Sequence, residues 1–166
     1  MDTLYLKRNR LGCGGNDVEA LKGLLECPTI SCLDISENYL KDPAIFEEVL
    51  LKMPNLAVLY SSGNDFVKHV PAFRKTCIAR IPTLRYLDDR PVFEEDRRRA
   101  EAYLRGGMDE ERAEMKLLKK EKDEKHWANH NAFRLMVSNA RKEKEEREAQ
   151  EATKDEKKLS MKEMMA

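Results

Sequence analysis

The chain has 166 residues, and its 31 lysines and arginines are balanced by 31 aspartates and glutamates. A formal net charge of zero gives no long-range field that would attract nucleic acid or an anionic membrane surface. Residues 1–93 hold 12 basic and 12 acidic residues, whereas the shorter remainder holds 19 of each. This rise in charge density marks the predicted boundaries. Residues 1–93 form the folded part and the start of its C-terminal cap, residues 94–150 form a cap helix and a charged helical extension, and residues 151–166 form a frayed or disordered tail.

A short pattern of leucines and asparagines recurs three times in the first part of the chain. Residues 4–11, 30–40 and 56–66 follow the form LxxLxLxxNxL, with their asparagines at Asn9, Asn38 and Asn64. The spacings of 29 and 26 residues are typical of leucine-rich repeats. A fourth copy begins at Leu84 and stops before its asparagine. The sequence therefore predicts an α/β leucine-rich-repeat solenoid with a short parallel sheet on the concave face and helices on the convex face.

Each repeat combines a short strand with a helix-forming segment. Alternating apolar residues such as Leu33 and Ile35 point to the interior, while each asparagine can bond the backbone of a neighbouring coil. Asn16 or Asp17 can cap a first helix, and Asp42 with the following proline can open a second. Because the first strand starts close to Met1 with no polar cap before it, we expect that further repeats belong upstream.

The side chains between the inner leucines should line the concave face. Tyrosine and arginine are enriched among the residues that anchor protein partners. We therefore predict a partner-binding surface made of Tyr5, Lys7, Asp34, Ser36, Val58, Tyr60, Tyr86 and Arg90.

The charged part reads as a solvated helix that breaks at Gly106 and Gly107. No sustained apolar heptad indicates a coiled coil. One apolar patch interrupts the charges, and it consists of Trp127, His130, Phe133, Met136 and Val137. This patch could fold back on the repeats, dock a partner helix or groove, or remain disordered.

No residue pattern indicates an enzyme, a cofactor or a metal site. His126 and His130 stand four apart but lack a third ligand, and the glycines at 12, 14 and 15 lack the lysine of a phosphate loop. The four cysteines form no CxxC pair, so we expect free, mostly buried thiols, with Cys77 in the core. No apolar run is long enough to span a bilayer.

Two stretches resemble a known family. PNLAVLYSSGN at 54–64 and the run from Phe73 to Glu114, which contains DDRPVFEE, resemble the dynein axonemal assembly factor one family. The resemblance implies a non-catalytic scaffold for cytoplasmic preassembly of dynein arms in ciliated or flagellated cells. Its implied partners are axonemal dynein chains or assembly chaperones, with no nucleic acid and no membrane. The sequence does not predict an oligomeric state.

Two alternatives share the same fold. A leucine-rich-repeat regulatory subunit would use the concave face to bind a phosphatase, and a related scaffold would bind an RNA-processing complex. The sequence departs from the family pattern at Ser61, where an apolar residue is usual, and at Asp65, where proline is common.

Overall fold

The fold is that of a computed structural model, which describes residues 2–164 and the side chains of residues 2–148. The chain divides into a compact unit, Met1–Leu117, and a helical unit, Leu118–Ala166. The first unit contains one five-stranded sheet in the order β1-β2-β3-β4-β5. Its strands are β1 (Asp2–Tyr5), β2 (Ile30–Asp34), β3 (Val58–Tyr60), β4 (Tyr86–Leu87) and β5 (Arg90–Pro91).

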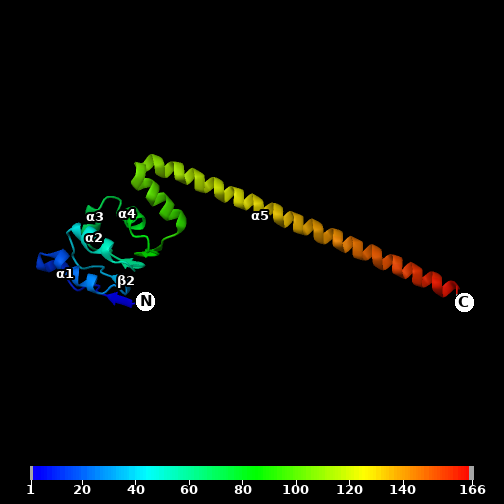
Figure 1. Cartoon of the computed structure of the whole chain (residues 1–166), viewed down its shortest axis with the longest axis horizontal. Helices are drawn as coiled ribbons and strands as arrows, with labels where there is room; N and C mark the ends of the chain where they lie inside the picture. Colours follow the sequence, from blue (N-terminus) through cyan, green and yellow to red (C-terminus); the bar gives the residue numbers. More distant parts are fainter. Residues whose placement is uncertain (1, 165–166) are drawn as a thin grey trace. The chain divides into compact units, whose positions relative to one another are not determined.

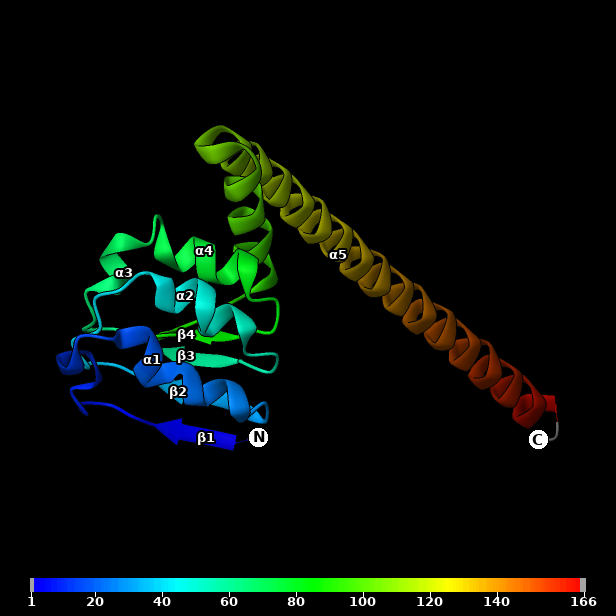
Figure 2. The ribbon, with the colours of Figure 1, turned by 60° about the vertical axis from the view of Figure 1, so that its left-hand side comes forward.

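The first four strands run parallel, and β5 turns back antiparallel to β4. Short helices follow the strands along the chain (Figure 1), and they stack on one side of the sheet (Figure 2). They are η1 (Leu11–Gly14), α1 (Asp17–Lys22), η2 (Gly23–Glu26), α2 (Ala44–Glu48), η3 (Leu50–Lys52), α3 (Phe66–His69) and α4 (Phe73–Arg80).

Both predicted helix starts are visible. The Asn16 side chain accepts a hydrogen bond from the Glu19 N–H at 3.2 Å, which caps α1. The Asp42 side chain accepts from the Ala44 N–H at 2.9 Å, just before α2. These bonds satisfy N–H groups that have no partner inside the helix.

The core lies between the sheet and these helices. The register aligns Leu4, Leu33, Leu59 and Leu87 in one row across the four parallel strands. The last three of these leucines are buried, while Leu4 is partly buried and packs against the same cluster. Because side chains alternate along a strand, the residues on either side of this row must face away from the helices.

Helix α5 (Glu94–Met164) is interrupted at the predicted place. Gly106 and Gly107 have non-helical backbone angles, and Gly107 has a φ of 72°, a conformation that favours glycine. The segment before this break packs on the repeats through the buried Ala100 and Ala102. The Arg97 guanidinium donates to the Ile78, Ile81 and Leu84 carbonyls.

Ion pairs join the two segments of α5 within the first unit. The buried Glu111 carboxylate pairs with Lys75 of α4 and with Arg99, and Glu114 pairs with Arg98. Hydrogen bonding to Lys75, the largest cause, lowers the pKa of Glu111. These contacts explain why the compact unit extends to Leu117, beyond the boundary that the charge density suggested at residue 93.

The architecture is therefore α/β, with a short, mostly parallel sheet and a long C-terminal helix. The helix includes residues as far as Met164, while residues 165–166 of the predicted tail lie outside the described residues. Within the described part of the chain, no helix has the length and apolar character needed to cross a membrane.

Candidate protein-binding surface

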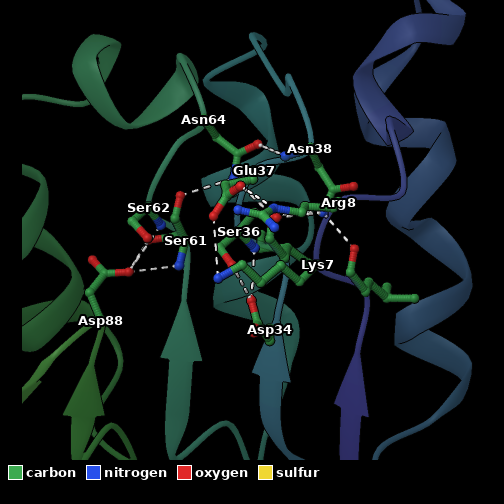
Figure 3. A network of polar contacts seen from close by, with 12 residues as sticks. Lys7, Arg8, Asp34, Ser36, Glu37, Asn38, Ser61, Ser62, Asn64 and Asp88 are labelled. Carbon is green, nitrogen blue, oxygen red and sulfur yellow. Dashed lines mark hydrogen bonds and ion pairs between the residues drawn. The ribbon is translucent and has the colours of Figure 1, made fainter.

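A ladder of asparagines holds the ends of the strands together (Figure 3). The Asn38 side chain accepts from the Asn9 N–H at 2.7 Å and donates to the Leu6 carbonyl at 2.7 Å. The Asn64 side chain repeats the arrangement one coil later, accepting from the Asn38 N–H at 3.0 Å and donating to the Ile35 carbonyl at 2.8 Å. Both side chains are buried, so the ladder satisfies backbone groups in and beside the interior of the repeats.

Asp88 ends this ladder in the fourth copy. Its Oδ1 atom accepts from the Ser61 N–H at 2.7 Å and from the Ser62 N–H at 3.0 Å. The buried Ser61 hydroxyl lies 3.4 Å from the same oxygen. Asp88 therefore bonds backbone groups that a further asparagine would otherwise serve. The polar residue at position 61 is explained by this carboxylate.

Rows of side chains cross the sheet on the face away from the helices. The register places Tyr5, Asp34 and Tyr60 in one row, on strands β1, β2 and β3. Cys32, Val58 and Tyr86 form the adjacent row. Tyr5 is 72% exposed, and Asp34, Tyr60 and Tyr86 are half-buried. This surface, called here the tyrosine face, presents aromatic rings on a rigid sheet.

The two central rings contact each other. The ring centroids of Tyr60 and Tyr86 lie 5.9 Å apart with an interplanar angle of 53°, within the range of favourable aromatic pairs. Burial raises the pKa of Tyr60, and its neighbours Tyr86, Cys32, Tyr5 and Asp34 add to that rise. The hydroxyl of Tyr60 is thus a neutral hydrogen-bonding group at ordinary pH.

A charged cluster borders the tyrosine face at the ends of the strands. Glu37 pairs with Lys7 at 3.2 Å and also accepts from Arg8. Hydrogen bonds from Arg8 and then Lys7 lower the pKa of the Glu37 carboxyl. The sequence reasoning missed Glu37 and Arg8. Each of the two residues directly precedes a repeat asparagine, in consecutive repeats. Opposite charges at the same repeat position were the signal in the sequence for this ion pair.

Two of the predicted partner-binding residues are placed differently by the structure. Ser36 is only 3% exposed, and its hydroxyl donates to Asp34 Oδ1 at 2.6 Å, so it supports the surface from below. Arg90 pairs with Leu87 across the β4–β5 hairpin and lines a hollow with Arg74 of α4. Opposed residues of an antiparallel pair share a face, so Arg90 lies on the helix side. The partner-binding role of these two residues stays a prediction, but Ser36 has little exposed surface and Arg90 lies beyond the last parallel strand.

The apolar patch of α5 belongs to the helical unit. Trp127 is 62% exposed, Phe133 62% and Met136 65%, whereas Val137 is half-buried. The Trp127 ring makes edge contacts with His126 and His130. The patch residues lie on a helix and most of their side chains are exposed. Which surface binds the patch stays a prediction.

The cysteines differ in exposure. All four are free, and Cys32 and Cys77 are buried, while Cys13 and Cys27 are exposed. Cys77 is a core residue, and its burial raises the pKa of the thiol. The expectation of mostly buried thiols therefore holds for two of the four. Among the described residues, no group of three or more histidines, cysteines and acids could hold a metal ion.

Comparison with known proteins supplies the family. No protein-family model matches the chain. The leucine-rich repeat-containing protein ODA7 of Chlamydomonas reinhardtii is 38% identical over 130 residues, which is 78% of this chain. Dynein axonemal assembly factor 1 of Homo sapiens is 38% identical over 131 residues, and its homologue from Anopheles gambiae is 47% identical over 106. The resemblance to the dynein axonemal assembly factor 1 family is confirmed.

The chain spans only part of these relatives. It covers 30% of the Chlamydomonas protein, 18% of the human dynein axonemal assembly factor 1 and 12% of the Anopheles homologue. The matched part includes most of the compact unit, since 78–79% of this chain is aligned with the Chlamydomonas and human proteins.

Proposed function

We propose that the chain forms the last coils and the cap of a leucine-rich-repeat solenoid. Three features support this proposal: the parallel register of β1 to β4, the asparagine ladder through Asn38 and Asn64, and the closing contacts of Asp88. In a solenoid each coil contacts its neighbours, and a polar cap protects the final one. The antiparallel β5 and the start of α5 fill that role here.

The proposed function is that of a non-catalytic scaffold for the preassembly of axonemal dynein arms. It would act in the cytoplasm, for the assembly of cilia or flagella, on protein partners such as axonemal dynein chains or assembly chaperones. The names of the relatives support the process, and the tyrosine face supports binding of a protein. Neither a nucleic acid nor a membrane is part of the proposal.

The observation that carries this function is the packed pair Tyr60 and Tyr86 beside the exposed Tyr5. Rigid tyrosines lose little conformational entropy when they bind, and they bury large areas with a polar tip. Substituting such an anchor commonly costs at least about 2 kcal/mol of binding free energy, or roughly thirtyfold in affinity.

The test is co-purification of the tagged chain from ciliated cells, followed by mass spectrometry. The Tyr60→Ala variant should lose most of the captured partner while remaining folded. Tyr39→Ala is the matched control, because Tyr39 is 59% exposed and lies in the turn after Asn38. Capture of dynein chains or chaperones supports the proposal. Capture of a phosphatase or of spliceosomal proteins would instead support one of the two rival functions.

A further inference from the structure

A single carboxylate stands between two tyrosines in the middle of the tyrosine face. Asp34 on β2 is in register with Tyr5 on β1 and with Tyr60 on β3. Neighbouring strands lie about 4.8 Å apart, so both rings are within reach of a group that binds above Asp34. Tyr5 is exposed and Tyr60 half-buried, which leaves one ring open and the other fixed.

The carboxylate is held in a defined orientation. Its Oδ1 atom accepts from the Ser36 N–H at 2.9 Å and from the Ser36 hydroxyl at 2.6 Å. Among the described residues, its second oxygen has no hydrogen-bond partner. Figure 3 shows Asp34 and Ser36 beneath the charged cluster at the strand ends.

The nearby cations of the chain are engaged elsewhere. Lys7 and Arg8, which follow Tyr5 on the same coil, both pair with Glu37. The neighbours of Tyr60 in its own row and the next are Asp34, Tyr86, Cys32 and Tyr5, and none of these carries a positive charge. The site thus combines a partly desolvated carboxylate with aromatic rings and no bound cation of its own.

From this arrangement we propose that Asp34, Tyr5 and Tyr60 bind an arginine side chain from an extended segment of the partner protein. A guanidinium is planar, so it can stack on a tyrosine ring and still present a hydrogen-bonding edge to the carboxylate. Charge-assisted hydrogen bonds of this kind are stronger than neutral ones.

The adjacent row specifies the neighbours of that arginine. Cys32 is buried and Val58 half-buried, so the surface beside the site is apolar. In an extended segment, residues two positions apart lie on the same side. The partner segment should therefore carry apolar residues two positions from the arginine. This inference rests on the proposed use of the tyrosine face, and it adds the chemistry of the partner.

The test uses a defined probe and the whole chain. The probe is a short acetylated peptide of alternating serine and leucine in which arginine replaces the central leucine, so that leucines stand two positions from it. A second peptide carries citrulline in place of the arginine, which keeps the shape of the side chain and removes its charge. Calorimetry should give at least about tenfold tighter binding of the arginine peptide, as for a hydrogen bond to a charged group. Asp34→Asn should abolish that difference, because its amide can still serve Ser36 but carries no charge.

Glu26→Gln is the control, since it removes an equal charge from an exposed position on η2, on the helix side. It should leave the preference intact, and thermal melting should confirm that both variants are folded. Equal binding of the two peptides, no binding of either, or an unchanged preference in Asp34→Asn would overturn the inference. If Tyr60→Ala still abolishes capture from cells in that case, the proposed function stands and only the arginine site fails. Failure of capture by the unsubstituted chain would instead remove the proposed function.

Discussion

The asparagine ladder makes a quantitative prediction about Asn38. Replacing Asn38 with alanine removes the bonds from the Asn9 N–H and to the Leu6 carbonyl, both 2.7 Å long. The Ile35 carbonyl keeps a donor from Asn64, and the Ser36 carbonyl keeps the Arg8 N–H. The Asn9 N–H and the Leu6 carbonyl therefore lose their partner, each at about 1–1.5 kcal/mol. The Leu11 N–H loses a longer, weaker bond of 3.5 Å, and the vacated space adds to the cost. We expect a total loss of about 2–4 kcal/mol.

Two further substitutions at the ladder separate hydrogen bonding from volume. Asn38→Asp keeps the acceptor but places a carboxylate oxygen against carbonyls of Leu6 and Ile35, so it should cost at least as much as alanine. Asn9→Ala changes an exposed side chain and keeps the backbone N–H that Asn38 accepts, so it should cost under about 0.5 kcal/mol.

The assay must report on the repeats alone. Trp127 is exposed on the helix, so its fluorescence does not follow unfolding of the sheet. Amide hydrogen exchange with mass spectrometry resolves peptides from β2 and β3 and converts protection into a local free energy of opening. A loss below about 1 kcal/mol for Asn38→Ala, or equal losses for Asn38→Ala and Asn9→Ala, would refute the ladder as a source of stability.

Substitutions at three other positions probe the cap and a close backbone contact. Asp88→Ala leaves two backbone N–H groups without their acceptor and should cost about 1–2 kcal/mol by the same exchange assay, whereas Asp88→Asn should cost clearly less. Glu111→Gln should loosen the helical segment after Gly107. Because the folded pKa of Glu111 is lowered, its contribution is present above the unfolded pKa of about 4.5 and is lost as pH falls through the lower folded pKa. A pH series of exchange measures this loss. In Gly12→Ala the new Cβ would stand 2.1 Å from the Tyr39 carbonyl oxygen, so thermal melting should show a large loss, and a wild-type midpoint would contradict the packing there.

The repeating part of the fold could be predicted because one pattern encodes both faces of the strand. The leucines at 33, 59 and 87 and the asparagines at 38 and 64 occupy equal positions in successive copies, and the structure aligns them. The same periodicity placed Tyr5, Asp34 and Tyr60 in one row. Local caps could also be predicted, since asparagine and aspartate are preferred at the position before the first turn of a helix.

The structure departs from the repeat pattern at the end of the array and at one position within it. A periodic pattern predicts a parallel continuation, and it cannot show that the chain turns back after Asp88 to form β5. Because of that turn, Arg90 lies on the helix side of the sheet. Ser36 is buried and donates a hydrogen bond to Asp34. The ion pair between Lys75 and Glu111 could not be read from the sequence either, because it joins α4 to a distant part of a stretch that reads as solvated helix.

The most direct test of the account is photo-crosslinking from the tyrosine face. A benzophenone amino acid at position 5 of the tagged chain stands on this face, and the same residue at position 39 stands on an exposed site outside the strands that form it. After irradiation of ciliated cells, the account predicts that position 5 gives crosslinks to dynein chains or assembly chaperones and that position 39 does not. Equal crosslinking from both positions, or none from position 5 while partners still co-purify, would contradict a partner-binding role for this face.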